Sequence, residues 1–429
     1  MALSGPGVPP FRDVVILTQF YAPEPGAPQV RLAALARELA RRGARVRVIT
    51  GMPNYPDGRI QPGYRGRLTM REDVAGVPVR RVWLYAAAGR GSLHRLLGYL
   101  SFTLAAAPAL LLGRRPDLVF VEAQPLTLAL PAWLLGVLRG VPWIYNTPDL
   151  QVELAGEAGW IAARPLLALA RRLEAFLMGR ALAVTTVTRA FLEHFARTRG
   201  VPAERLCFLP NGADVAWLRP LPRDAALAAR LGVDGRRVVT YAGTHAPYQG
   251  LEVLVQAAAR LRHRRDVAVL IVGRGPERER LVAAARTAAL DNVLFRDVPF
   301  ADMPRLMSVS DLFVATLRDF PSARGMRLSK AVPPLACGVP VVYAGDDEMA
   351  ALIEREGCGV RVPPGRPDLL ADAIARLVDD PERRRAMGRR GRALAERAFA
   401  WPALVDAWLA QVAALHGAGR PAGAPAGAA

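Results

Sequence analysis

Lysine is almost absent from this chain. Of its 57 basic residues, Lys330 is the single lysine and the others are arginine. A replacement of lysine by arginine on this scale is most simply a bias in codon usage. A lysine that remains can therefore stand where a planar guanidinium cannot replace a compact ammonium. Phosphate binding is the usual reason for such a requirement. Lys330 is a candidate phosphate ligand, with a solvated surface lysine as the alternative.

Cysteine is also scarce, and the sequence shows no signal for export. Cys207, Cys337 and Cys358 are widely spaced and odd in number, and they lie in apolar or glycine-rich surroundings. This pattern predicts neither a disulfide framework nor a zinc site, and it fits a reducing compartment. The first ten residues contain no charged region followed by an apolar one. We therefore expect no secretory signal and a cytoplasmic location.

Acidic residues are too few to balance the arginines, so the formal net charge is +19 at pH 7. This charge favours an anionic partner, which could be acidic membrane lipid, nucleotide phosphate or nucleic acid. No block of arginines is interleaved with aromatic residues, as a groove for single-stranded nucleic acid would require. We therefore expect a nucleotide and an anionic membrane surface as partners, and no nucleic acid. Strongly salt-dependent binding of duplex would support the nucleic-acid alternative.

Long apolar runs are few. The uncharged stretch at residues 96–113 is bounded by Arg95 and Arg114, and its 18 residues are at the lower limit for a membrane-spanning helix. Gly98 and Pro108 weaken a span. Packing against a sheet or lying in the membrane interface is the favoured interpretation, and a true span is the alternative.

The order of apolar runs predicts an α/β protein of two domains. Residues 14–18, a Pro/Gly-rich loop, an amphipathic stretch at 30–43 and residues 46–50 form a strand, helix, strand pattern. After the turn signal Asn211-Gly212 the same pattern begins again. We predict a first Rossmann-like, doubly wound domain at 1–218, a second at 219–400, a helix at 401–416 and a disordered tail at 417–429. In open α/β sheets, ligands bind outside the carboxyl ends of the strands, so we expect a cleft between the two domains to be the site.

Two glycine-containing loops in the second half could approach phosphate. Residues 243–250 (GTHAPYQG) follow an apolar strand and precede a helix, where unpaired backbone N–H groups attract anions. Gly273-Arg274-Gly275 follows the next strand, but Arg278 occupies the place of the third glycine of a dinucleotide fingerprint, so a Rossmann cofactor site is not expected. Each loop also has a purely structural reading as a turn.

A series of short motifs follows in order along the chain: Pro210-Asn211-Gly212, Tyr241-Ala242-Gly243, Gln249-Gly250-Leu251, Val272-Gly273, Ser329-Lys330 and Gly338-Val339-Pro340-Val341. Taken together, this series resembles glycosyltransferase family 4. The upstream loop at 21–26 (YAPEPG) and the pair Asp149-Leu150 are similar to its subgroup of colanic-acid and N-acetyl-fucosaminyl transferases.

The resemblance implies a GT-B fold with an acceptor-side first domain, a second domain that binds the nucleotide sugar, and a C-terminal helix that crosses back to the first domain. It implies a retaining glycosyltransferase that uses a UDP- or GDP-sugar and needs no cofactor or metal. The expected acceptor is a polyprenyl-diphosphate-linked sugar, or another saccharide, at the inner face of the membrane, as in capsule or exopolysaccharide assembly.

Candidate site residues follow from the loops and the resemblance. We expect Lys330 to bind the diphosphate, Asp149 to orient or deprotonate the acceptor, and Glu348 to bind the ribose. An N-cap is the alternative role for Asp149, and a solvated acidic loop is the alternative for Glu348. Gly26 and Ala27 would line the acceptor-side wall. The candidate nucleotide-sugar-binding residues are Gly243, Thr244, His245, Gln249, Arg274, Arg327 and Ser329.

Two departures from the family pattern leave other functions open. Pro333 and Gly325 occupy positions at which the family usually has glutamate. A catalytically inactive relative that binds membrane or partner proteins is therefore the main alternative. A nucleotide-sugar epimerase, which would consume the donor without an acceptor, is another. A metal site at Asp346-Asp347 is not expected, because two tandem α/β domains argue against the fold that uses such a pair.

Overall fold

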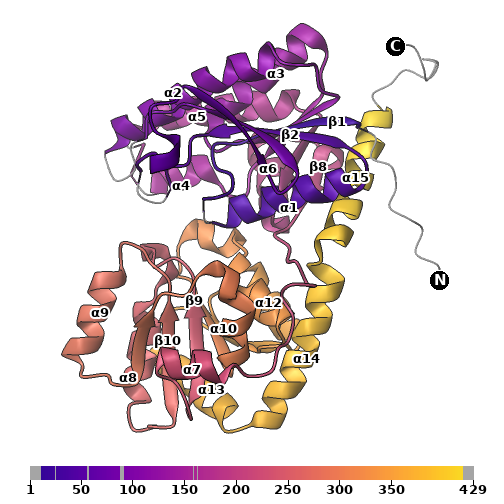
Figure 1. Ribbon diagram of the computed structural model, residues 1–429. Coiled ribbons are helices and arrows are strands. Elements are labelled where there is room, and N and C mark those ends of the chain that lie inside the picture. Colours follow the sequence, from indigo (N-terminus) through magenta and orange to yellow (C-terminus); the bar gives the residue numbers. More distant parts are fainter. Residues whose placement is uncertain are drawn as a thin grey trace, which may run out of the picture. The chain divides into compact units, whose positions relative to one another are not determined.

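The computed structural model describes residues 11–24, 26–55, 58–86, 91–157, 159–161 and 163–418. The chain divides into two compact units (Figure 1): one runs to Asn211 and resumes at Trp401, and the other is Gly212–Ala400. The boundary therefore lies between residues 211 and 212, whereas sequence analysis placed it after residue 218. Residues 212–218 belong to the second unit, because Ala213 pairs with Ala400 and Leu218 is buried in that unit's core.

The first unit contains an eight-stranded sheet in the order β3-β4-β2-β1-β5-β6-β7-β8. All neighbouring pairs are parallel except β3 with β4. The strands are β1 (Asp13–Leu17), β2 (Arg45–Gly51), β3 (Thr69–Val74), β4 (Val77–Val82), β5 (Leu118–Glu122), β6 (Trp143–Asn146), β7 (Ala183–Thr186) and β8 (Leu206–Phe208). The helices are α1 (Ala27–Arg41), α2 (Ser92–Leu111), α3 (Ala129–Arg139), α4 (Gln151–Glu157), α5 (Arg164–Arg180) and α6 (Arg189–Arg199).

The central strands of this sheet are apolar because helices cover both faces. Strands β1, β5, β6 and β7 are buried along their whole length. Helix α1 packs on one face, whereas α2 and α3 pack on the other through buried side chains such as Phe102 and Leu135. The antiparallel β3 alternates between exposed and half-buried residues, as expected of an edge strand, and it was missed by the search for apolar runs.

Helix α15 (Trp401–Ala418) belongs to the first unit, although it follows the whole second unit in the chain. Trp408 is completely buried in the first unit's core, and its indole N–H donates to Thr185 Oγ1 at 3.2 Å. Arg42 at the end of α1 donates to Asp406 at 2.8 Å. Residues 417 and 418, predicted to be disordered, are the last turn of this helix. The rest of the predicted tail, from 419, lies outside the described residues.

The second unit is built around a six-stranded parallel sheet in the order β11-β10-β9-β12-β13-β14. Two apolar cores, one on each face, bury it. The strands are β9 (Arg237–Ala242), β10 (Val267–Val272), β11 (Val293–Arg296), β12 (Leu312–Thr316), β13 (Val341–Ala344) and β14 (Gly359–Val362). The helices are α7 (Ala225–Leu231), α8 (Glu252–Arg260), α9 (Arg278–Thr287), α10 (Met303–Val309), α11 (Val332–Ala336), α12 (Glu348–Arg355), α13 (Pro367–Val378) and α14 (Pro381–Ala398). This pair of Rossmann-like sheets confirms the predicted fold class.

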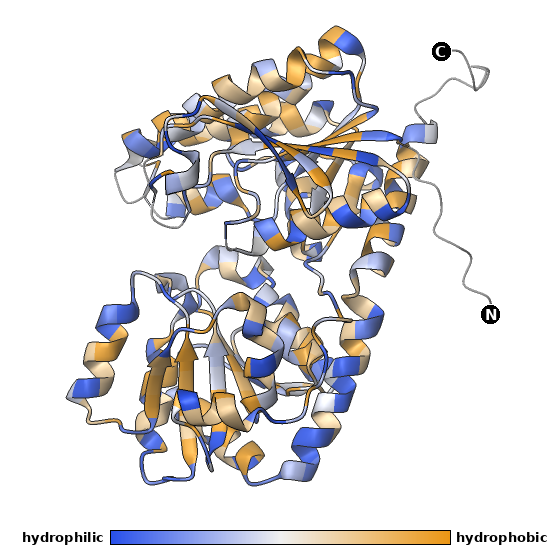
Figure 2. Ribbon diagram, in the orientation of Figure 1, coloured by the Kyte–Doolittle hydropathy of each residue, from blue (hydrophilic) through white to orange (hydrophobic). Residues whose placement is uncertain are grey.

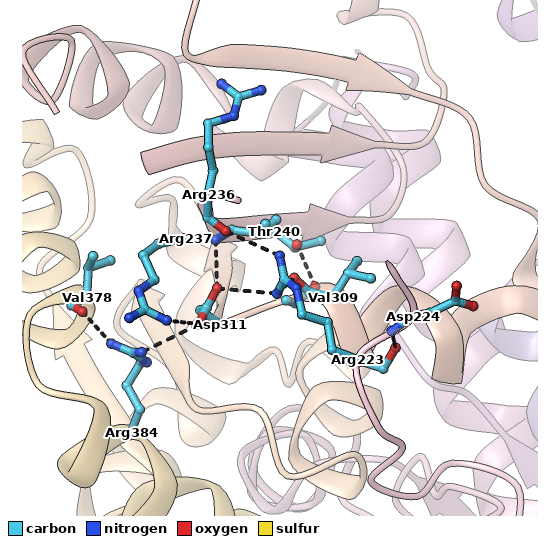
Figure 3. A network of polar contacts seen from close by, with 12 residues as sticks. Arg223, Asp224, Arg236, Arg237, Thr240, Val309, Asp311, Val378 and Arg384 are labelled. Carbon is cyan, nitrogen blue, oxygen red and sulfur yellow. Dashed lines mark hydrogen bonds and ion pairs between the residues drawn. The ribbon is translucent and has the colours of Figure 1, made fainter. Parts of the chain in front are cut away.

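A charged network ties α14 to the amino ends of two strands of the second unit (Figure 3). Asp311, just before β12, accepts from the backbone N–H of Val238 at 2.9 Å and lies within 4 Å of three guanidinium groups, those of Arg223, Arg237 and Arg384. The Arg384 side chain is buried and also donates to the carbonyls of Leu377 and Val378, which end α13. The network lies at the strand edge opposite the carboxyl ends, so we assign it a structural role.

The stretch at 96–113 forms most of α2, and one side of this helix packs on the first sheet. Phe102, Ala106 and Leu110 are buried there. Within the part of the chain that the structure describes, no helix is long and apolar enough to cross a membrane.

Candidate active site

Lys330 lies at the carboxyl end of β9 in the second unit, in a single 3₁₀ turn, Ser329–Ala331, that precedes α11. Its Nζ donates to the hydroxyl of Tyr241 at 2.5 Å and to Oε1 of Gln249, and it lies 4.5 Å from the centre of the Tyr241 ring. Burial lowers the pKa of Lys330 to about 7. The structure therefore brings together two residues predicted for the donor site, Lys330 and Gln249, and gives the lysine uncharged neighbours.

Tyr241 holds the lysine in place, and sequence analysis gave it no role beyond membership of a motif. It is buried near the end of β9, and its hydroxyl donates to the carbonyl of Thr244 at 2.8 Å while accepting from Lys330. Burial raises the pKa of Tyr241 well above 10, so the phenol stays protonated. A buried tyrosine at the end of an otherwise apolar strand was the available signal, because its hydroxyl needs a partner.

The two glycine-containing loops contact each other through their backbones. A Cβ on Gly273 would lie 2.0 Å from the carbonyl oxygen of Gly243, and a Cβ on Gly275 would lie 2.5 Å from that of His245. The N–H of Gly243 donates to Val272 and that of His245 to the carbonyl of Arg274. Of the loop 243–250, which was predicted to offer unpaired N–H groups to phosphate, the N–H groups of Gly243 and His245 are therefore not available, because each joins the loop after β9 to the end of β10 or the loop after it. Gly273 and Gly275 lack a Cβ, which allows the two loops to pack this closely.

His245 is completely buried beneath these loops. Burial and the positive charge of Arg278 lower its pKa to about 4, so the imidazole is neutral at pH 7. Neither ring nitrogen has a hydrogen-bond partner among the described residues. The Tyr241 ring lies 6.1 Å from the imidazole, centre to centre, which places His245 beside the residue that holds Lys330.

Arg327 and Glu348, predicted separately for donor binding, lie together. Arg327 Nη1 is 3.5 Å from Glu348 Oε1, and the guanidinium lies 4.9 Å from the centre of the Phe399 ring. Glu348 is the first residue of α12, and its neighbour Asp347 caps that helix by accepting from the N–H groups of Met349 and Ala350. The alternative of a wholly solvated acidic loop does not describe Glu348, whose side chain is 26% exposed.

The remaining second-unit candidates are more exposed. Arg274 extends into solvent with 81% of its side chain exposed, and it pairs with Asp297 at 3.1 Å. Thr244 is exposed, and Ser329 is half-buried in the turn that carries Lys330. Asp346 pairs with Arg361. Among the described residues, no group of three or more His, Cys, Asp or Glu could hold a metal ion.

Asp149 follows β6 in the first unit. Its carboxylate accepts from Gln124 Nε2 at 3.3 Å, and its backbone carbonyl accepts from the Thr147 hydroxyl at 2.8 Å. Within the described residues this carboxylate accepts no backbone N–H from α4, so the N-cap alternative is not observed. Burial raises the pKa of Asp149, and Gln124 and Arg31 oppose that shift. A carboxylate with a raised pKa is a better proton acceptor.

Beside Asp149 lies a buried polar cluster that the sequence analysis missed. Glu122, the last residue of β5, accepts from Arg31 Nη2 and from Asn146 Nδ2, both at 2.5 Å. The three side chains are almost completely buried. Burial raises the pKa of Glu122, and Arg31 and Asn146 oppose the shift. Polar residues that end two adjacent apolar strands were the signal, because the carboxyl ends of parallel strands meet at one edge of the sheet.

Gly26 and Ala27 form the start of α1 in the same unit. Gly26 is the N-cap residue with φ of 149°, and its carbonyl accepts from Val30 N–H at 3.2 Å. A Cβ at Gly26 would lie 2.4 Å from Oε1 of Gln29, so the loop passes directly over this buried side chain. Ala27 begins the helix three residues earlier than the apolar pattern predicted.

Both units thus present charged and polar side chains at the carboxyl ends of parallel strands, as nucleotide-dependent α/β enzymes do. A family model described as a glycosyl transferase 4-like domain matches residues 26–212, and one described as glycosyl transferases group 1 matches 236–380. The chain belongs to the glycosyltransferases of the family 4 type and is an enzyme with the GT-B fold, as the motifs predicted.

Individual relatives support this assignment. The 2-deoxystreptamine N-acetyl-D-glucosaminyltransferase of Streptomyces fradiae is 30% identical over 402 residues, which cover 87% of this chain and 90% of that protein. The putative colanic acid biosynthesis glycosyl transferase WcaI of Escherichia coli K12 is 29% identical and covers 79% of this chain and 86% of its own length.

Solved structures show the same fold. Anabaena Alr3699/HepE in complex with UDP-glucose has a TM-score of 0.70 at 20% identity, with 95% of this chain and 99% of that chain covered. WaaG, a glycosyltransferase involved in lipopolysaccharide biosynthesis, has a TM-score of 0.66 at 16% identity, with 92% and 98% covered.

Proposed function

We propose that this enzyme transfers a sugar, with retention of anomeric configuration, from a UDP- or GDP-sugar to a lipid-linked or saccharide acceptor. The reaction would serve cell-surface polysaccharide biosynthesis at the inner face of the membrane. The observation that carries the proposal is Lys330, the single lysine, which is held by Tyr241 and Gln249 at the carboxyl end of β9. Two similar proteins, one named for colanic acid biosynthesis and one solved in complex with UDP-glucose, support the substrate classes.

The donor residues would act on the departing diphosphate. As the bond between sugar C1 and the diphosphate oxygen breaks, negative charge accumulates on the phosphates and must be stabilised. Lys330 would supply the cation in its ammonium form, so the proposal needs no metal cofactor. Arg327 would be the second cation, and Glu348 beside it would accept a hydrogen bond from the ribose.

The acceptor residues would act on the attacking hydroxyl. A new bond forms between sugar C1 and the acceptor oxygen, and the hydroxyl proton must go to a base. Asp149 is our candidate, because its raised pKa favours proton uptake and Gln124 fixes its orientation. The acceptor we propose is a polyprenyl-diphosphate-linked sugar, and Gly26 with Ala27 would line this side of the site.

Calorimetric titration of UDP and GDP tests the proposal. We expect one nucleotide to bind to the wild type and to Arg262→Ala, a control at an exposed position of the same unit, and not to Lys330→Ala. Asp149→Asn should bind the same nucleotide with unchanged affinity and lose transfer. If neither nucleotide binds to the wild type, the proposal fails, and an inactive relative with Pro333 and Gly325 in place of family glutamates becomes the better account.

A further inference from the structure

The outer surface of α2 is apolar, although its inner surface is already packed on the sheet. Leu93, Leu96, Leu97, Leu100 and Leu104 are exposed, with exposed fractions between 39% and 72%. Their spacing of three and four residues places them in one stripe along the helix. A helix that is apolar all round is typical of burial on both sides. Within this unit, one side of α2 has the sheet as its partner and the other has solvent.

The neighbouring helices extend this surface. Helix α3 packs beside α2 and exposes Leu134, Val137 and Leu138, the last two at 65%. Helix α5 packs against α3, with the rings of Trp133 and Phe176 5.3 Å apart. Figure 2 shows α2 and α3 coloured mostly as hydrophobic.

Helix α5 carries a stripe of its own. Leu166, Leu169 and Phe176 are exposed along it at helical spacing. We define the apolar face as the exposed leucine, valine and phenylalanine side chains of α2, α3 and α5. A contiguous apolar surface on a soluble unit usually has a partner.

The charges around the apolar face are of one sign. Helix α2 contains one arginine, α3 one and α5 four, and these helices contain a single acidic residue, Glu174. Glu174 is buried and paired with Arg199 at 2.7 Å, so it does not offset the positive charge at the surface. Arg164 and Arg172 are exposed next to the leucines of α5. Arg95 of α2 lies over the exposed ring of Trp160, four residues before the start of α5, at 3.8 Å.

This combination matches the chemistry of an anionic lipid surface. Leucine and phenylalanine enter the boundary between headgroups and acyl chains, tryptophan prefers the headgroup level, and arginine binds lipid phosphate. A protein partner would need a complementary acidic rim, and a second copy of this chain would bring the same positive charge. We infer that the apolar face of α2, α3 and α5 is the surface through which this enzyme lies on an anionic membrane. This inference rests on the proposed function in one respect: a lipid-linked acceptor would lie in the membrane that the first unit contacts.

Flotation with lipid vesicles tests the inference. The wild type should float with vesicles of phosphatidylcholine mixed with phosphatidylglycerol, and much less with phosphatidylcholine alone. Leu104→Glu, at a position 72% exposed, should abolish flotation, whereas the matched control Leu68→Glu, 76% exposed in the same unit but outside the apolar face, should float like the wild type. Both positions are exposed, so neither change should affect folding, and thermal unfolding checks this. Leu97→Glu is a second variant for which we expect the same loss.

The charges are tested separately. An arginine near an anionic surface contributes about a fivefold increase in affinity, so the double variant Arg164→Ala/Arg172→Ala should bind mixed vesicles about thirtyfold more weakly. The double variant Arg262→Ala/Arg265→Ala removes the same charge from the second unit and should bind like the wild type. Equal losses in both double variants would show that the overall net charge is responsible and would overturn the assignment to this face.

Other outcomes also decide the matter. If the wild type does not float, or if Leu104→Glu floats like the control, the inference is wrong. If sedimentation shows a wild-type dimer that Leu104→Glu dissociates, and neither the wild type nor the variants bind vesicles, the apolar face is a subunit interface instead. Nucleotide titration of Leu104→Glu separates this result from the proposed function. Loss of flotation with retained nucleotide binding supports both conclusions, whereas flotation without nucleotide binding in the wild type removes only the proposed function.

Discussion

If Lys330 binds the diphosphate as we propose, its low pKa should make nucleotide binding depend on proton uptake. In the free protein the pKa is lowered to about 7, because burial disfavours the ammonium. A bound diphosphate favours the ammonium and raises that pKa again. At about pH 8, roughly nine tenths of the free protein has a neutral Lys330, so binding should take up about 0.9 proton. The apparent dissociation constant should increase about tenfold, or about 1.4 kcal/mol, for each pH unit above 7 until the pKa of the complex is reached.

The neighbouring groups do not interfere over this range. Tyr241 has a pKa well above 10 and stays protonated. His245, with a pKa of about 4, stays neutral and would titrate only in acid. The remaining direct partner of Lys330, Gln249, does not ionise. The terminal phosphate of a nucleoside diphosphate is largely ionised above about pH 7, because its last pKa is near 6.

Calorimetry in buffers of different ionisation enthalpy measures the number of protons taken up. Lys330→Arg keeps its charge at every pH used, so any binding that it retains should show no proton uptake and no pH dependence between about 7 and 9. The reasoning is refuted if the wild type binds at about pH 8 without proton uptake, or if Lys330→Arg takes up as many protons as the wild type.

The same pKa shift affects stability with a definite sign. An unfolded lysine has a pKa of about 10.4, so between about pH 7 and pH 10 the unfolded chain binds more protons than the folded one at this position. The contribution of Lys330 to the free energy of unfolding therefore rises with pH across that window and is least favourable below 7. Lys330→Met should remove this contribution. The melting temperature of the variant minus that of the wild type should therefore be larger at about pH 7 than at about pH 9.

Three further predictions concern the packing that supports the site. Gly273→Ala should disrupt the contact between the β9 and β10 loops, because its Cβ would lie 2.0 Å from the carbonyl oxygen of Gly243 at a φ of 124°, and nucleotide titration should show weaker binding. Asp311→Asn should lower the free energy of unfolding of the second unit by about 2 kcal/mol, because three arginines lose their shared carboxylate. The loss is moderate because two of these arginines are partly exposed. Denaturant titration measures this change, and an unchanged free energy of unfolding would contradict the prediction. Trp408→Ala should cost the first unit about 3–5 kcal/mol in the same assay, because the side chain is completely buried. If the unfolding transition of the first unit is unchanged in Trp408→Ala, α15 does not stabilise this unit.

Several strands could be predicted from the sequence closely, and others could not. Residues 14–18 and 46–50 were predicted as strands, and β1 (Asp13–Leu17) and β2 (Arg45–Gly51) lie within one residue of those bounds, because the inner strands of a parallel sheet are short apolar runs bounded by loops. Strand β3 alternates exposed and half-buried residues and includes charged ones, so it carried no such signal. The three-residue β8 was too short to recognise.

The sequence by itself determined the family and the class of fold and singled out Lys330 as a candidate, because ordered motifs and a single exceptional residue are properties of the chain. Only the tertiary structure decided what surrounds Lys330, since Tyr241 and Gln249 are 89 and 81 residues away from it. The tertiary structure likewise showed that the N–H groups of Gly243 and His245, in the loop after β9, donate to the carbonyls of Val272 and Arg274 at the end of β10 and just after it. A sequence pattern within one loop does not contain this pairing. It also showed which side of α2 is left exposed, because an apolar run has no direction until one side of the helix is packed on a sheet.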